Sequence, residues 1–140
     1  MPKKRVLAKP PELIACALIE DNGRILFLKS KSADGKDLIS LPCAPVPKGG
    51  NPVQILSEAV KEQAGIDAHV QAPALKGRLN VGTRKSKYWI PAIAFTTTSK
   101  SLRASPSPPF TGTAWLSAID ALKKRFSRTS EWLRDCENVS

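Results

Sequence analysis

The chain has 140 residues, and 41% of them are hydrophobic, which is enough to fill the core of one domain and excludes a wholly disordered chain. Its 22 lysines and arginines against 12 aspartates and glutamates give a formal net charge of +10, which favours anionic partners such as nucleotides, nucleic acid or lipid headgroups without choosing among them. No apolar run approaches the roughly 18 residues that cross a bilayer, so a membrane-spanning role is excluded.

The amino-terminal residues predict a basic extension, residues 1–11, ahead of a single domain that covers residues 12–140. Lys3, Lys4 and Arg5 precede a seven-residue apolar stretch, which superficially resembles a secretion signal. No small-residue cleavage site follows that stretch, so a buried strand is the better interpretation. A cytoplasmic location is therefore the default expectation.

The cysteines indicate free thiols rather than a structural framework. Cys16, Cys43 and Cys136 are an odd number with no C-x-x-C pair, and His69 is the one histidine of the chain. A disulfide framework or a zinc site is not expected from that pattern. Free thiols are typical of a reducing compartment.

The chain opens with a predicted hairpin. Residues 13–19 are apolar at nearly every position, as expected for a strand covered on both faces. Asn22-Gly23 supplies the turn, because these residues tolerate the positive φ angles of tight hairpins, and residues 24–29 return as a second strand. A polar loop over residues 32–37 then leads to a short strand at 38–41.

The middle of the chain predicts a loop and then a helix. Residues 42–51 contain three prolines and two glycines, so we expect an irregular loop. A helix is expected over residues 52–64, because Asn51 is a favoured N-cap, proline fits the first helical position, and an apolar stripe recurs at helical spacing. Gly65 is expected to end this helix.

The second half predicts strands followed by two helices. Ser117 is expected to cap a helix that runs to about Arg125, and Thr129 or Ser130 to cap another that runs to about Asp135. Taken together, the elements predict a mixed β-sheet between helices, which is the α/β class. The expected elements before Ser117 are extended segments at 66–75 and 76–81 with a break at Pro73, a basic turn at 82–87, a strand at 88–98, an exposed loop at 99–109 and a strand at 113–116.

One stretch resembles the signature of the Nudix family, which reads G-x5-E-x7-R-E-U-x-E-E-x-G-U, with U a bulky aliphatic residue. Laid over this chain, the signature runs from Ala44 to Ile66 without a gap, and it follows Leu41-Pro42-Cys43-Ala44 where the family usually has L-P-G-G. Val60 and Gly65 keep their expected types. The resemblance implies a Nudix-like α/β/α sandwich with a mixed β-sheet.

The resemblance also implies chemistry, because the family cuts nucleoside diphosphates linked to another group with divalent cations that carboxylates hold. Three of those carboxylates share one helix face, at spacings of three and four residues. Here that face carries Ala59, Glu62 and Gln63, and Gly50 replaces the signature's isolated glutamate. The implied metal site is degraded: Glu62 is the remaining ligand, and Mg²⁺ binds with low affinity or not at all.

Glu58 stands where the signature has its arginine. It lies roughly 100° around the helix from its neighbour, so it is not an obvious replacement ligand. One interpretation is a solvated helix residue. The other is a rearranged metal site in which Glu58 and Glu62 are the catalytic residues.

The candidate ligand-binding residues are Lys29, Lys48, Gly49, Gly50 and Gln63. A lysine and two glycines just before a helix N-terminus favour a phosphate group. The alternative is a turn that needs glycine conformations.

A second basic segment mixes cations with aromatic rings. Arg84, Lys85 and Lys87 precede Tyr88 and Trp89, and such residues can hold a phosphate backbone and stack a base. RNA is therefore a candidate partner at this segment. The alternative is a hairpin tip that is basic for solubility alone.

Three functions remain open. The leading hypothesis is a Nudix-fold protein with a degraded metal site that binds a nucleotide or similar phosphorylated ligand, with weak or absent diphosphate hydrolysis. The first alternative is an active Mg²⁺-dependent pyrophosphohydrolase whose remodelled site uses Glu62, Glu58 or a later acid such as Asp120. The second is a basic RNA- or protein-binding module on the same scaffold.

Overall fold

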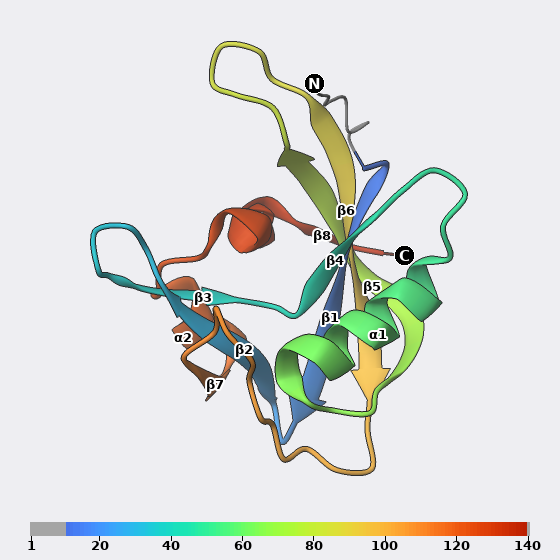
Figure 1. The fold of residues 1–140 in the computed structure, drawn as a ribbon, viewed down its shortest axis with the longest axis vertical. Helices are drawn as coiled ribbons and strands as arrows, with labels where there is room; N and C mark the ends of the chain where they lie inside the picture. The colour runs from blue at the N-terminus through green and yellow to red at the C-terminus, as the bar shows by residue number, and fades with distance from the viewer. Residues whose placement is uncertain (1–10, 140) are drawn as a thin grey trace, which may run out of the picture.

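The computed structural model describes residues 11–139, and its centre is one mixed sheet of eight strands (Figure 1). The strand order is β3-β2-β1-β6-β5-β8, with β4 paired to β1 and β7 paired to β2. The predicted extension lies outside the described residues except for Pro11, so the division at residue 11 stays a prediction. The strands are β1 Leu13–Asp21, β2 Arg24–Lys31, β3 Asp37–Ser40, β4 Cys43–Val46, β5 His69–Asn80, β6 Trp89–Thr98, β7 Gly112–Leu116 and β8 Glu137–Asn138.

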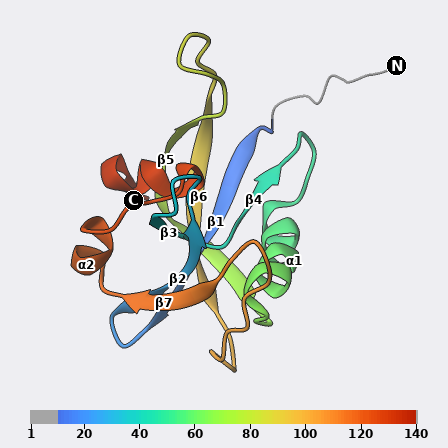
Figure 2. The same ribbon diagram turned by 60° about the vertical axis from the view of Figure 1, so that its left-hand side comes forward.

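Helical segments cover both faces of this sheet. Figure 2 shows α1 (Pro52–Ala64) on one side of the strands, and α2 (Ala118–Leu122) with the 3₁₀ segment η2 (Arg128–Asp135) on the other. Each side has its own cluster of buried apolar residues. The predicted α/β/α sandwich with a mixed sheet is therefore confirmed. Among residues 11–139, no helix is long and apolar enough to cross a membrane.

The opening hairpin forms as predicted. Asn22 and Gly23 have φ angles of 53° and 77°, the positive values that a two-residue hairpin turn requires. The first strand, β1, lies between a parallel neighbour, β6, and an antiparallel neighbour, β4. Its side chains alternate between the two buried clusters, with Ile14 and Cys16 in one and Ala15, Ala17 and Ile19 in the other. Both of its faces are therefore covered, which explains why its sequence is apolar throughout instead of alternating.

The predicted irregular loop at 42–51 is wrong at its start, because residues 43–46 form β4. This strand runs antiparallel to β1, and Ala17 N–H donates to the Pro42 carbonyl at 2.8 Å. Hydrogen-bonded and non-hydrogen-bonded residue pairs alternate along an antiparallel strand pair. Pro45 lies opposite Ile14 in a non-hydrogen-bonded pair, so β1 does not require a backbone N–H from this position. A proline is tolerated there because β4 is an edge strand.

The helix is the element that the sequence predicts best. Asn51 Oδ1 accepts hydrogen bonds from the backbone N–H groups of Val53 and Gln54 at 3.0 and 3.2 Å. Gly65 ends the helix with a left-handed φ of 70°. The buried stripe of Leu56, Val60 and Ala64 packs against the sheet. Both predicted caps and both predicted ends are thus confirmed.

The carboxyl-terminal part differs from the prediction. Ser117 caps α2 as expected, but the helix ends at Leu122 because the chain turns to bury Phe126 beside Ile39. The predicted helix after Thr129 or Ser130 is instead η2, a 3₁₀ segment that follows Ser127. The short strand β8 was not predicted, and β5 is one strand with register shifts around Pro73 instead of two segments.

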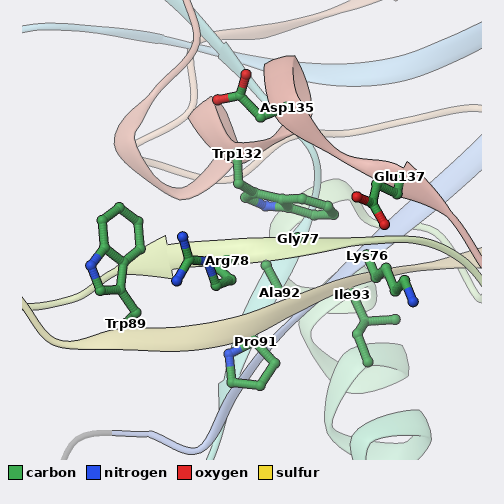
Figure 3. A pocket seen from close by; sticks show the side chains of 10 residues that line it. All are labelled: Lys76, Gly77, Arg78, Trp89, Pro91, Ala92, Ile93, Trp132, Asp135 and Glu137. Carbon is green, nitrogen blue, oxygen red and sulfur yellow. The ribbon is translucent and has the colours of Figure 1, made fainter.

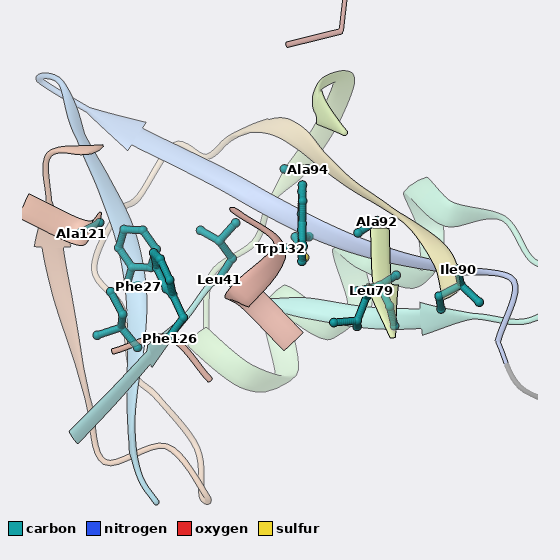
Figure 4. Packing of buried hydrophobic residues seen from close by; sticks show 12 residues of the cluster. Phe27, Leu41, Leu79, Ile90, Ala92, Ala94, Ala121, Phe126 and Trp132 are labelled. Carbon is teal, nitrogen blue, oxygen red and sulfur yellow. The ribbon is translucent and has the colours of Figure 1, made fainter. Parts of the chain in front are cut away.

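The side chain of Trp132 on η2 packs the carboxyl-terminal segment against the sheet (Figure 4). Its side chain is 4% exposed and packs in the same cluster as Leu41 and Ala94. The indole lies directly on β5: a Cβ built on Gly77 would stand 2.7 Å from Trp132 Cε3, closer than real Cβ contacts come. The glycine at position 77 is thus required by the close approach of the indole.

We expect Gly77→Ala to destabilise the fold by about 1–3 kcal/mol, the usual cost of overpacking a filled site. Gly112→Ala is the matched control, because Gly112 also lies in a strand and its added Cβ would meet only Lys29 Cδ at 3.8 Å. Urea unfolding of both variants measures the difference. Equal midpoints for the two variants would contradict the proposed packing of Trp132.

Candidate functional site

The helix face that corresponds to the family's metal site carries three different side chains. Ala59 and Gln63 are half-buried, and Glu62 is exposed. Ala59 has no polar atom to offer. Whether this face can bind a cation therefore depends on how the side chains of Gln63 and Glu62 are placed.

Gln63 is bonded to the backbone of β4 through both ends of its side-chain amide. Its Nε2 donates to the Cys43 carbonyl at 2.7 Å, and the Cys43 N–H donates to Oε1 at 3.2 Å. Cys43 pairs with Cys16 without hydrogen bonds, so its N–H and C=O point away from β1 and toward α1. The amide thus satisfies two backbone groups that β1 leaves free.

A carboxylate cannot replace this amide. It would accept from the Cys43 N–H, but it has no proton for the carbonyl, and its negative charge would face the carbonyl oxygen. The backbone carbonyl of Gln63 is held as well, since Ser107 N–H donates to it at 3.1 Å. Gln63 is therefore fixed at its side chain by β4 and at its backbone by the loop that precedes β7.

Glu58 and Glu62 line a different hollow. They border a cavity of about 470 Å³ between α1 and the start of β5. Lys61 lies between them in sequence and forms an ion pair with Asp67 at 3.0 Å. His69 also lines this cavity, whereas Gln63 does not. The two candidate catalytic glutamates therefore border one cavity, and Gln63 does not line it.

The candidate phosphate loop forms a turn. Gly50 N–H donates to the Pro47 carbonyl at 2.9 Å, and Gly49 has a φ of 81°. Lys48 is exposed at this turn, and Asn51 already accepts from the first free N–H groups of α1. Lys29 lies elsewhere, half-buried on β2 opposite Gly112 of β7. The five candidate ligand-binding residues thus lie in three separate places.

The donor atoms near Gln63 do not fit Mg²⁺. This ion takes oxygen ligands in near-octahedral geometry, usually with one or two carboxylates. Ala59 contributes none, and the Gln63 amide is turned to the Cys43 backbone. Over residues 11–139, no group of three or more His, Cys, Asp and Glu side chains lies together in a way that could hold a metal ion.

A larger cavity of about 600 Å³ lies at the edge of the sheet formed by β5 and β6 (Figure 3). The indoles of Trp89 and Trp132 flank it, and the Arg78 guanidinium carbon lies 4.9 Å from the centre of the Trp89 ring. Asp135 and Glu137 border it from the carboxyl-terminal segment. Sequence reasoning missed this cavity because it depends on η2 crossing the sheet, which no local pattern indicates.

The basic segment is the turn of the β5–β6 hairpin. Arg84, Lys85 and Lys87 are all exposed on it, and Tyr88 and Trp89 are 52% and 47% exposed. The turn is built around the Asn80 side chain, whose Oδ1 accepts from the N–H groups of Gly82 and Tyr88 at 2.9 and 3.0 Å. Cations and aromatic rings are thus presented together on this hairpin, whose backbone Figure 1 shows between β5 and β6.

Comparison with known proteins establishes the fold. No protein-family model matches the sequence, and no curated protein matches it. Among solved structures, the E. coli ORF135 protein superposes with a TM-score of 0.69 at 19% identity, covering 87% of this chain and 85% of that one. The MutT protein from Methanosarcina mazei gives 0.62 at 22% identity, with 93% and 92% covered.

A third solved structure is the NUDIX domain of Shewanella oneidensis NrtR, determined in complex with ADP ribose. It superposes with a TM-score of 0.59 at 13% identity and covers 91% of this chain and 84% of that one. The chain therefore has the Nudix fold, as the resemblance of residues 44–66 implied. The sequence similarity to these proteins is low, so the likeness is one of fold.

We expect Gln63→Glu to destabilise the protein by about 1–3 kcal/mol at neutral pH, because the Cys43 carbonyl loses its donor. Beside that carbonyl the new carboxyl group has a raised pKa, since only its protonated form can donate. An acid whose pKa is raised by folding loses stability as the pH rises, so the deficit relative to wild type is small below about pH 4 and grows toward neutrality.

Chemical denaturation across this pH range measures the difference. Glu62→Gln is the control, because it makes the reverse exchange of amide and carboxylate at the adjacent, exposed position. It should change stability by less than about 0.5 kcal/mol at every pH. A Gln63→Glu variant as stable as wild type at pH 7 would contradict the role assigned to the amide.

Proposed function

We propose that this protein binds a nucleotide or similar phosphorylated ligand and hydrolyses diphosphates weakly or not at all. The observation that carries the proposal is the bonding of the Gln63 amide to both the N–H and the C=O of Cys43. A position that supplies a cation ligand in the family's signature is here used to hold the edge strand. Its structural role opposes the presence of a carboxylate.

Electrostatics supports the same conclusion. The face formed by Ala59, Glu62 and Gln63 carries one formal negative charge. At an effective dielectric constant of about 20, each carboxylate a few ångströms from a unit charge contributes about 4 kcal/mol, and more toward a divalent ion. Losing two such groups weakens cation binding by several orders of magnitude. Hydrolysis that needs the cation to activate water is weakened with it.

The cavity at the β5–β6 edge supports ligand binding. Its volume, about 600 Å³, is within the range of small-molecule sites. The Trp89 ring, which is 47% exposed, can stack a base, and Arg78 and Lys76 can pair with phosphates. Asp135 and Glu137 offer acceptors for sugar hydroxyls. ADP-ribose, which has all three of these groups, is the first ligand to test.

A remodelled hydrolase is the second candidate. Glu58 and Asp67, two acids outside the signature's glutamates, border the same cavity as Glu62 and His69. In this case Glu62 is indispensable. Asp120, the other acid considered, lies on α2 and is 3.9 Å from Lys123, on the opposite side of the sheet from α1 (Figure 2).

We expect ADP-ribose to raise the melting temperature to the same extent with and without Mg²⁺ or Mn²⁺, because binding does not use the cation. Diphosphate release, measured on the same samples, should stay near background. Glu62→Ala should keep the shift unchanged, with Ser57→Ala on the same cavity as the control. A shift that needs metal, together with turnover that Glu62→Ala abolishes, would establish the remodelled hydrolase instead.

We expect Trp89→Ala to weaken ADP-ribose binding by about tenfold or more, since stacking on an aromatic ring is worth roughly 1–3 kcal/mol per base. Tyr88→Ala is the matched control, because Tyr88 is equally exposed but does not line the cavity. Titration calorimetry of the two variants measures the difference. Equal losses from both would contradict a site in this cavity.

The exposed cations and rings of the hairpin tip favour one further function, an RNA-binding module. That function predicts retention on single-stranded RNA that falls steeply with salt. It also predicts that RNA retention is lost when Arg84, Lys85 and Lys87 are replaced together by alanine. RNA retention should likewise be lost in Tyr88→Ala and in Trp89→Ala. Tyr88→Ala therefore distinguishes the tip from the cavity.

A further inference from the structure

Cys16 and Cys43 are direct partners across the β1–β4 pair. Since Ala17 N–H donates to the Pro42 carbonyl, the next pair along, Cys16 with Cys43, is a non-hydrogen-bonded one. At such pairs the Cα atoms approach to about 4.5 Å and the side chains leave the sheet on the same face. That separation lies within the roughly 4.4–6.8 Å that a disulfide spans.

The two thiols share one pocket of the core. Cys16 is fully buried and Cys43 half-buried, and both belong to the cluster beneath η2. The indole nitrogen of Trp132 is buried there without a hydrogen-bond partner among the described residues. Trp132 packs in the same cluster as both cysteines, and its indole N–H offsets a small part of the rise in the pKa of Cys16. The core therefore holds a polar group that the neutral thiols leave unsatisfied.

The two sulfurs differ in acidity and access. A hydrogen bond with Cys16, helped by Thr129, lowers the pKa of Cys43 to about 7 in spite of its burial. The hydrogen bond with Cys43 and burial raise the pKa of Cys16 well above its ordinary value. Cys43, the more accessible of the two, is thus the thiol that ionises first as the pH rises. The thiolate is the nucleophilic form of cysteine.

We propose that Cys16 and Cys43 form a peroxide-reactive dithiol, which hydrogen peroxide converts to a disulfide between β1 and β4. The Cys43 thiolate attacks one peroxide oxygen, the O–O bond breaks, and the hydroxide that leaves is protonated to water. Cys43 is then a sulfenic acid. Cys16 sulfur attacks the Cys43 sulfur, the S–O bond breaks, and the Cys16 proton goes with the hydroxide as a second water.

Overall, two thiols and one molecule of hydrogen peroxide give one disulfide and two molecules of water. The two sulfurs lose two electrons and the peroxide gains them. The cross-link and the Gln63 contact share one residue, because the amide bonds the backbone N–H and C=O of Cys43. Oxidation would therefore join β1, β4 and α1 into one connected unit. A dithiol reductant reverses the step.

The test is peroxide oxidation of the full chain followed by thiol counting and peptide mapping. The reduced protein has three cysteines, and we expect one titratable thiol to remain after stoichiometric peroxide, with the loss of two hydrogen atoms in the intact mass. Trypsin places Cys16 in the peptide 6–24, Cys43 in 37–48 and Cys136 in 135–140. The first two should appear linked, and dithiothreitol should restore three thiols.

The pH dependence of this reaction is a second readout. The groups near the two sulfurs are the Thr129 hydroxyl and the Trp132 indole from η2, and the Gln63 amide bonds the Cys43 backbone from α1. The one charge that contributes to either pKa is that of Cys43 itself, which raises the pKa of Cys16. The rate should therefore follow ionisation of Cys43 alone. It should rise about tenfold from pH 6 to pH 8 and level off above that, as expected for a pKa near 7.

Cys136→Ser is the control variant, because burial raises the pKa of that thiol and it lies on neither β1 nor β4. It should leave the linked peptide unchanged. Cys16→Ala should trap Cys43 as a sulfenic acid that dimedone captures. Three thiols that persist in peroxide, a link that involves Cys136, or oxidation of Cys43 to a sulfinic acid in the wild-type chain without a cross-link would each overturn the proposal.

Discussion

The side-chain amide of Gln63 joins α1 to the edge strand β4 through two hydrogen bonds to one residue, Cys43. Both backbone groups of Cys43 point away from β1, so without this amide they would be half-buried without partners. This contact fixes β4 against the last turn of α1. The chemistry open to the helix face follows as well, since an amide in this role leaves no room for a metal-binding carboxylate.

The elements that the sequence predicted well are those with local causes. The hairpin turn needs two residues that accept positive φ, and Asn22-Gly23 supplies them. The helix begins at an asparagine whose side chain bonds its first N–H groups and ends at a left-handed glycine, Gly65. Each of these signals lies within four residues of the structure that it determines, so tertiary contacts did not override it.

The elements that it missed depend on contacts between distant residues. β4 has three prolines within or directly beside it and is a strand only because β1 pairs with it. The 3₁₀ form of η2 follows from anchoring contacts such as Leu41 N–H to Ser130 Oγ, 89 residues apart, and from the indole of Trp132 on Gly77. For the candidate site, spacing located the helix face correctly, but it could not reveal that Gln63 binds backbone or that Trp89 is exposed beside a cavity.

The outer edge of β4 has a further consequence for how the protein behaves among its own copies. An open strand edge is a template on which another chain can add a strand and begin to aggregate. Here the first outward-facing N–H and C=O groups of β4 belong to Cys43, and both are hydrogen-bonded to the Gln63 amide. The next outward-facing nitrogen belongs to Pro45, which has no hydrogen to donate. The sheet is therefore closed to further growth at β4 by a side-chain amide and an imino acid, without a charged residue on the strand.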